Sequence, residues 1–251
     1  MGGTGTGHSA IASAELALDL CMLQLPKVIG HRGAMAYAPE NTLESFREAR
    51  RRGATWVEID VKLTADGVPV VMHDDSLKRT TGVDRLVAET PAAELPPSVP
   101  TFEQAIACFG DLGLGCNVEI KPCAGRETET ARVAVAALRR LWPAALPAPL
   151  LSSFKDGSLA AARQAAPEFA RALLIDDLKD DWQARAEAVS AAGLNTNGKR
   201  LTAVRAVEIR KAGFALSVYT INDGDVARAL FGMGVQCVIS DAPDVILAAL
   251  P

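Results

Sequence analysis

The chain has 251 residues, of which 49% are hydrophobic and 22% charged, and its formal net charge is −4. This balance is typical of a globular protein with a sizeable core, in one large domain or two small ones. A net acidic chain argues against a nucleic-acid binder, for which a basic surface is typical. Five cysteines without a CxxC pair, and no recognisable secretory signal, indicate reduced thiols and a cytoplasmic location.

Residues 1–25 are expected to lie outside the fold. The first part of this segment is rich in glycine and threonine, a composition typical of disorder. Ile11–Leu25 is apolar but contains Glu15 and Asp19, and no basic residue precedes it. It is therefore a poor signal peptide, and it is too short and too charged to span a membrane. We predict a disordered or loosely ordered extension, no stable membrane insertion, and a single domain over residues 26–251.

From Pro26 onward, short apolar runs alternate with helical patterns. The apolar runs predict strands near residues 28, 57, 118, 151, 173, 194, 217 and 238. An extra hairpin strand is predicted at 68–72, after the Asp66-Gly67 turn signal. Helices are predicted between the strands, over 42–52, 102–109, 127–141, 157–166, 181–192, 202–212, 223–233 and 242–250. Asn41 or Thr42 is expected to cap the first helix, and Thr101 the second.

This alternation predicts parallel strands joined by crossover helices. Eight strand–helix units in about 225 residues suit an α/β fold of the (β/α)₈ TIM barrel type, with a small insertion after the second strand. A doubly wound open sheet is the competing fold. It loses its commonest support, because no Gly-x-Gly-x-x-Gly follows the first strand.

Two of the three histidines stand where strands are predicted to end. His31 follows the run Val28-Ile29 and is next to Arg32, and His73 follows the hairpin strand. Two imidazoles that titrate near neutral pH can act as general base and general acid in phosphodiester cleavage. A simpler interpretation of His73 is a hairpin-end histidine that pairs with Asp74 or Asp75. In the catalytic interpretation, the same aspartates would instead orient the ring.

Carboxylates occupy one face of two predicted strands. Side chains alternate along a strand, so Glu58 and Asp60 point the same way, and Glu119 repeats the pattern next to Lys121. Three carboxylates inside a barrel would repel one another unless a cation lay among them. The alternative is simple ion pairing with Arg32 and Lys121, which a single Glu-x-Asp pair would favour. Two such patterns, combined with two strand-end histidines, favour the cation.

The charges of this set balance around a bound phosphodiester. A divalent cation, Arg32 and Lys121 together exceed the three carboxylates by one positive charge, which a phosphodiester monoanion would cancel. Oxygen ligands indicate Mg²⁺ or Ca²⁺. Cys116 and Cys123 flank Glu119 at a spacing that does not suit a metal ligand set.

Several blocks of the sequence, in order and at compatible spacing, resemble the glycerophosphodiester phosphodiesterase family. The resemblance spans roughly residues 27–245. The blocks are Gly30-His31-Arg32-Gly33, Pro39-Glu40-Asn41-Thr42, Glu58-Ile59-Asp60-Val61, residues 73–82, Val99-Pro100-Thr101-Phe102-Glu103 and Asn117-Val118-Glu119-Ile120-Lys121-Pro122. It implies a (β/α)₈ barrel that hydrolyses glycerophosphodiesters, as small-molecule substrates, to sn-glycerol 3-phosphate and an alcohol.

The resemblance also implies roles for individual residues. The matching positions are Glu58, Asp60 and Glu119 for one divalent cation, His31 and His73 for acid/base catalysis, and Arg32 and Lys121 for the phosphate. Glu40 would lie near Arg32 and support it, and residues 65–113 would contain the family's small insertion.

Two motifs depart from the family pattern or carry less information. Tyr219 stands where many relatives have tryptophan, and it is expected to bind substrate by packing against the glycerol. The motif Ser240-Asp241-Ala242-Pro243 is interpreted as the start of a helix, with a side-chain cap and a proline near the first helical position. Two other functions remain open alternatives: a related barrel phosphodiesterase acting on lysophospholipids, and a barrel that binds a phospho-ligand without catalysis.

Overall fold

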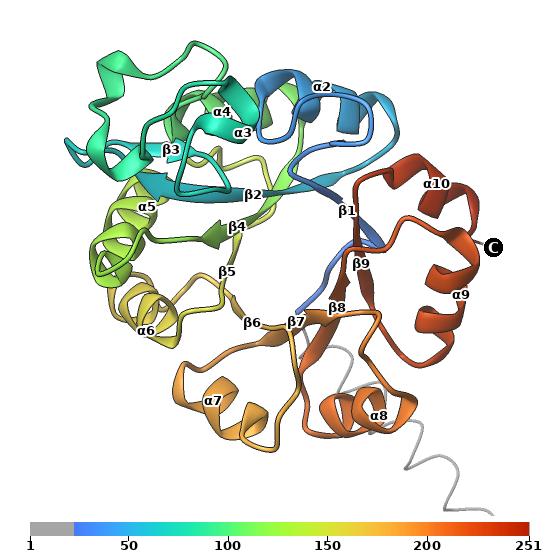
Figure 1. Ribbon diagram of the computed structural model, residues 1–251. Coiled ribbons are helices and arrows are strands. Elements are labelled where there is room, and N and C mark those ends of the chain that lie inside the picture. The colour runs from blue at the N-terminus through green and yellow to red at the C-terminus, as the bar shows by residue number, and fades with distance from the viewer. Residues whose placement is uncertain (1–22, 251) are drawn as a thin grey trace, which may run out of the picture.

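The computed structural model describes residues 23–250, and a closed barrel of parallel strands lies at its centre (Figure 1). The ring consists of β1 (Val28–His31), β2 (Trp56–Leu63), β4 (Gly115–Ile120), β5 (Leu150–Ser153), β6 (Arg171–Ile175), β7 (Gly193–Asn197), β8 (Ala215–Tyr219) and β9 (Cys237–Ser240). It closes because β1 pairs in parallel with both β2 and β9. β3 (Pro69–Val71) pairs antiparallel with β2. The predicted (β/α)₈ barrel and its extra hairpin strand are confirmed, and the open doubly wound sheet is wrong.

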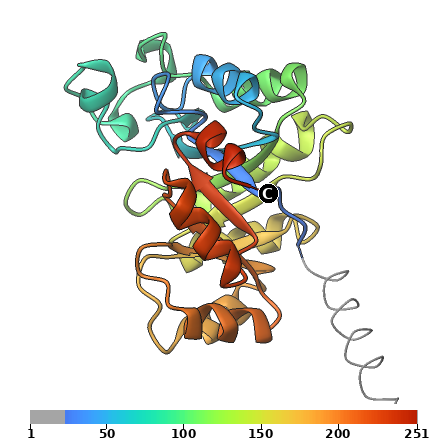
Figure 2. The same cartoon turned by 90° about the vertical axis from the view of Figure 1, so that its right-hand side faces the viewer.

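Helices surround the barrel on its outer side (Figures 1 and 2). They are α2 (Leu43–Arg51), α4 (Phe102–Leu112), α5 (Glu127–Leu141), α6 (Asp156–Ala165), α7 (Trp182–Ala188), α8 (Ala203–Lys211), α9 (Gly224–Gly232) and α10 (Pro243–Ala248). The predicted helix over 181–192 is too long at its C-terminal end. The chain leaves the helix there because Ser190 has a left-handed backbone, with φ of 49°.

Local signals set the ends of the first two helices. Thr42 caps α2, and Thr101 caps α4, each accepting a hydrogen bond from the third helical backbone N–H in a reciprocal capping box. Gly113 ends α4 in the left-handed conformation, with φ of 65°. The predicted cap at Thr101 is confirmed, and Thr42 rather than Asn41 caps the first helix.

The packing of β2 decides which of its side chains enter the barrel. Val57, Ile59 and Val61 are fully buried in the core cluster that also contains Phe46 of α2 and Phe109 of α4. Because side chains alternate along a strand, the residues between them point to the barrel interior. The apolar contact with the helices therefore fixes the inward direction of the polar residues on β2.

The segment between β2 and β4 forms a small layer beside the barrel mouth. Besides β3 and α4, it contains the helical turns α3 (Lys78–Thr81), η1 (Val87–Glu89) and η2 (Ala92–Glu94). It has its own apolar cluster, in which Met72 and Leu77 pack with Val87 and Val99. This cluster anchors the loop that carries His73.

The sequence prediction for residues 1–25 falls mostly on residues 1–22, which lie outside the described residues. Leu23 and Leu25 are described, and they pack against the apolar cluster of Ile29 and Trp56. Within residues 23–250, every helix is too short or too polar to cross a membrane.

Candidate active site

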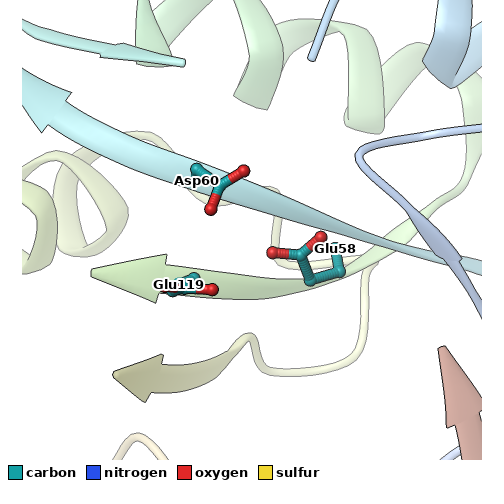
Figure 3. A group of neighbouring side chains, drawn as sticks. All are labelled: Glu58, Asp60 and Glu119. Carbon is teal, nitrogen blue, oxygen red and sulfur yellow. The ribbon is translucent and has the colours of Figure 1, made fainter. Parts of the chain in front are cut away.

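Three carboxylates meet at the mouth of the barrel (Figure 3). Glu58 and Asp60 come from β2, and Glu119 comes from β4, whose register places it beside Asp60. One oxygen of each lies within 4.8 Å of the others. All three residues are at most 8% exposed. The period-2 pattern in the sequence thus brings these residues together as expected.

Burial and mutual repulsion make the three carboxyl groups unequal acids. Burial raises the pKa of Glu119 to about 7, and the negative charge of Asp60 adds to this effect. Burial also raises the pKa of Glu58 well above its usual range, and the negative charges of Asp60 and Glu119 add to this effect. Burial alone would raise the pKa of Asp60 too, but Lys121 and Arg32 outweigh it and lower that pKa to about 2.

A divalent cation fits this donor set. The carboxylate oxygens are close enough to share one ion, and hard cations such as Mg²⁺ and Ca²⁺ prefer oxygen ligands. Such an ion would also offset the repulsion that raises the pKa of Glu58 and Glu119. Glu58, Asp60 and Glu119 would therefore hold it.

Two cationic side chains flank the carboxylates. The Arg32 guanidinium places Nε 3.3 Å from Asp60 Oδ2 and donates from Nη1 to Glu40 Oε1 at 2.8 Å. The Lys121 ammonium lies 3.0 Å from Glu119 Oε1 and 3.3 Å from Asp60 Oδ1. Both cations thus lie beside the acidic cluster, where they can contact an anion that approaches it.

The loop after β1 is shaped to bring Arg32 to this position. Arg32 itself has a left-handed backbone, with φ of 49°, and its N–H donates to Glu58 Oε2 at 3.1 Å. Gly33 follows with φ of 90°, packed against Ser45. Asn41 also has a positive φ, of 58°, and its amide donates to Asp60 Oδ2 at 2.8 Å. The loop thus contacts Asp60 Oδ2, whereas Lys121 lies near Asp60 Oδ1.

His31 is held by a residue that the sequence interpretation assigned to a helix start. Its Nδ1 lies 2.6 Å from Asp241 Oδ1, and its Nε2 lies 3.9 Å from Glu58 Oε2. Asn222 fixes Asp241 by donating from its amide to Oδ2 at 2.7 Å and by accepting from the Asp241 N–H at 2.8 Å. The predicted side-chain cap is therefore wrong: α10 begins after Ala242 without one, although Pro243 does occupy its first position.

His73 has a matching partner on the other side of the site. Its Nδ1 lies 2.6 Å from Asp74 Oδ1. Arg79 of α3 donates to Asp74 and, through two further hydrogen bonds, to Glu40. Burial lowers the pKa of His73, although Asp60 and Asp74 act in the opposite direction. Glu40 thus lies near Arg32 as expected, and it also connects Arg32 to the partner of His73.

Two adjoining cavities open at this site. The smaller, of about 150 Å³, is lined by both histidines, by Glu58 and by Tyr219. The Tyr219 ring lies 6.0 Å from the Phe154 ring in an edge-on arrangement. The larger cavity, of about 590 Å³, shares His73 with the first. Seven of the predicted site residues line one or both of these cavities: His31, Arg32, Glu58, His73, Glu119, Lys121 and Tyr219. Asp60 and Glu40 line neither cavity, but both contact Arg32.

Three residues with a supporting position were missed by sequence reasoning. Asp241 and Asn41 each stand in a motif that also suits a helix start. Their contacts with His31 and Asp60 are distant in sequence, so no local pattern predicted them. Lys62 did give one, because it continues the inward pattern of Glu58 and Asp60 on β2. It is 2% exposed, and its ammonium donates to Asp75 Oδ1 at 2.6 Å and to the Lys121 carbonyl at 3.2 Å.

Fold and site together define a (β/α)₈ barrel enzyme with an acidic cluster, two cations and two aspartate-paired histidines at the C-terminal strand ends, where such barrels carry their active sites. Residues 31–245 match the model of the glycerophosphoryl diester phosphodiesterase family. The chain therefore belongs to this family.

Individual relatives agree with this assignment. A solved phosphodiesterase from Oleispira antarctica, in complex with its product sn-glycerol-3-phosphate, is 40% identical, covers 90% of this chain and 96% of its own, and superposes with a TM-score of 0.87. A glycerophosphodiester phosphodiesterase from Thermotoga maritima is 27% identical, with a TM-score of 0.76 over 91% of this chain and 100% of its own. Human glycerophosphodiester phosphodiesterase 1 is 39% identical over 117 residues, which cover 40% of this chain and 35% of the human protein.

Proposed function

We propose that the chain hydrolyses glycerophosphodiesters to sn-glycerol 3-phosphate and an alcohol, with His31 and His73 as its acid/base pair and one divalent cation at Glu58, Asp60 and Glu119. Membership of the family supports the reaction class. The observation that carries the residue roles is the pairing of each histidine, through Nδ1, with an aspartate, while both rings line one cavity beside the acidic cluster.

The aspartate contacts define what each imidazole can do. A carboxylate accepts hydrogen bonds, so Asp241 and Asp74 place the proton of each neutral ring on Nδ1 and leave Nε2 free to exchange a proton with the substrate. One imidazole takes the proton of the attacking oxygen as its bond to phosphorus forms. The other enters the step as an imidazolium, with protons on both nitrogens, and gives its Nε2 proton to the alkoxide as the bond between phosphorus and the leaving oxygen breaks, which leaves it neutral.

The cationic residues hold the phosphate. Arg32 and Lys121 lie beside the acidic cluster and would contact the non-bridging oxygens of the diester, which gain negative charge during displacement. A bound Mg²⁺ or Ca²⁺ would supply Lewis-acid stabilisation of the same charge. Glu40 would keep the Arg32 guanidinium in place through its 2.8 Å contact.

The test is the release of sn-glycerol 3-phosphate from glycerophosphoethanolamine by the full chain, with and without a chelator. Turnover is expected only with a divalent cation. His31→Ala and His73→Ala are each expected to lower kcat by about 10²-fold or more. His8→Ala is the matched control and should leave kcat unchanged. Full turnover in either of the first two variants would refute the acid/base assignment.

We also propose a cytoplasmic location. The support is that Cys108, Cys116, Cys123 and Cys237 are buried free thiols, as expected in a reducing compartment. Fractionation of cells that produce the chain, with antibody detection, tests this location.

A further inference from the structure

The guanidinium of Arg79 connects two carboxylates from different parts of the chain. Arg79 belongs to α3, in the insertion between β2 and β4. It donates to Asp74 from Nε at 2.6 Å and from Nη2 at 3.0 Å. It also donates to Glu40, in the loop after β1, from Nη1 at 2.6 Å and from Nη2 at 2.8 Å. One side chain thus forms a pair of charge-assisted hydrogen bonds with each carboxylate, and such pairs fix orientation as well as distance.

Each of these carboxylates contacts a residue of the proposed reaction. Asp74 Oδ1 lies 2.6 Å from His73 Nδ1, and Glu40 Oε1 accepts from Arg32 Nη1 at 2.8 Å. The same Nη2 of Arg79 serves both Asp74 and Glu40, so the two acidic groups would repel each other if this cation were removed. Arg79 therefore allows Asp74 to stay beside His73.

The surroundings of Arg79 indicate that its value does not lie in stability. Its side chain is 49% exposed, and exposed ion pairs contribute little to the free energy of unfolding. All four residues of α3 are at least partly exposed. A cavity of about 300 Å³ is lined by residues 39–42 of the loop and by Thr80 and Thr81 of α3. Packing between the loop and α3 is therefore incomplete, and the contacts of Arg79 define how the two segments meet.

We propose that Arg79 is a positioning residue, which holds Asp74 against His73 and links it to the loop that carries Arg32. This inference rests on the proposed function. Arg79 lines neither of the two cavities at the site, so it acts through Asp74 and not on the substrate. Both oxygens of Asp74 accept from Arg79, and the carboxylate cannot turn away from the imidazole without breaking one of these bonds.

The first test measures hydrolysis of glycerophosphoethanolamine by the full chain. Arg79→Ala is expected to lower kcat by about 10-fold or more, a size typical of losing a residue that orients a site residue. KM should change by about twofold or less, because Glu40 keeps its own contact with Arg32. A purely structural role would not confine the loss to kcat.

Arg205→Ala is the matched control. Arg205, on α8, also bridges two carboxylates, Asp180 and Glu208, and its side chain is 31% exposed, but it lines neither cavity at the site. It should leave kcat unchanged. Arg79→Lys keeps the charge but lacks the planar fork, so its kcat should lie between those of the wild type and Arg79→Ala. Thermal melts confirm folding, and Arg79→Lys provides the comparison if Arg79→Ala does not fold.

Two further measurements ask whether Arg79 acts through Asp74. In an Asp74→Asn background, Arg79→Ala should cost about twofold or less in kcat, because the residue through which it acts is already lost. Guanidinium chloride at a low, non-denaturing concentration should restore part of the kcat of Arg79→Ala, because the free ion can pair with the two carboxylates. Urea has the same planar shape without the charge, and neither urea nor sodium chloride should restore it.

The outcomes separate the two levels of the proposal. No release of product by the wild-type chain overturns the proposed function itself. With an active wild type, an unchanged kcat in Arg79→Ala or Arg79→Lys overturns the positioning role alone. The same holds for a loss that is as large in the Asp74→Asn background as in the wild type, and for recovery that is equal with urea and with guanidinium.

Discussion

Binding of a divalent cation is expected to release protons, because burial favours the protonated form of two of the three carboxyl groups. Burial raises the pKa of Glu119 to about 7, and it raises that of Glu58 well above its usual range. Asp60 stays ionised, because Lys121 and Arg32 outweigh its burial. A cation that takes all three carboxylates as ligands therefore competes with protons at Glu119 and Glu58.

The size of the effect follows from these pKa values. When the pH is below the pKa of a ligand, each further fall of one pH unit weakens the apparent metal affinity about tenfold for every proton displaced. Glu119 is mostly protonated at pH 6 and mostly ionised at pH 8, so the Mg²⁺ affinity should strengthen by about tenfold or more between them. Tenfold is about 1.4 kcal/mol of binding free energy. Titration calorimetry in two buffers of different ionisation enthalpy measures both the affinity and the number of protons released.

Two variants make this linkage specific. Glu119→Gln cannot lose a proton, so it should bind Mg²⁺ more weakly and release about half a proton fewer at pH 7, where a group with a pKa of about 7 is half protonated. Glu129→Gln changes an exposed carboxylate that pairs with Arg126 on the outer helix α5, and it should alter neither quantity. An Mg²⁺ affinity that stays constant from pH 6 to pH 8 would refute the reasoning.

Three further predictions concern the residues around the site. Asp241→Asn should lower kcat by about 10²-fold at unchanged melting temperature, because the amide no longer fixes the His31 tautomer; steady-state kinetics and thermal melts check this. Gly33→Ala should destabilise the fold by about 2 kcal/mol or more in urea unfolding, since its φ is 90° and a Cβ would meet Ser45, whereas Gly67→Ala, at a φ of 80° with open space, should cost about 1 kcal/mol. Thr101→Ala should cost about 1 kcal/mol in the same assay, through loss of the α4 cap.

The fold could be predicted because each barrel unit repeats the same local signals. The alternation of apolar runs with capped helices sets both the order of the elements and the parallel direction of the strands. Helix ends without a capping signal were harder to predict from the sequence. The end of α7 depends on the left-handed backbone of Ser190. A glycine at this position would have predicted that conformation, whereas a serine does not.

The inner set of site residues was also visible in the sequence, because the two-residue period of β2 fixes the direction of Glu58 and Asp60. The supporting residues were less visible. Asp241 occurs in a motif that suits a helix start just as well, and its contact with His31 joins positions 210 residues apart. The contact between His31 and Asp241 depends on how the barrel closes, and no spacing pattern along the chain predicts it.

The closure of the barrel between β1 and β9 has a consequence for biosynthesis. The ribosome makes both histidines and all three carboxylates within the first half of the chain, but β9 and Asp241 emerge only at its end. His31 gains its partner when the last strand docks against the first. A nascent or prematurely terminated product therefore lacks the Asp241 contact to His31, and the proposed acid/base pair would be complete only once translation is nearly finished.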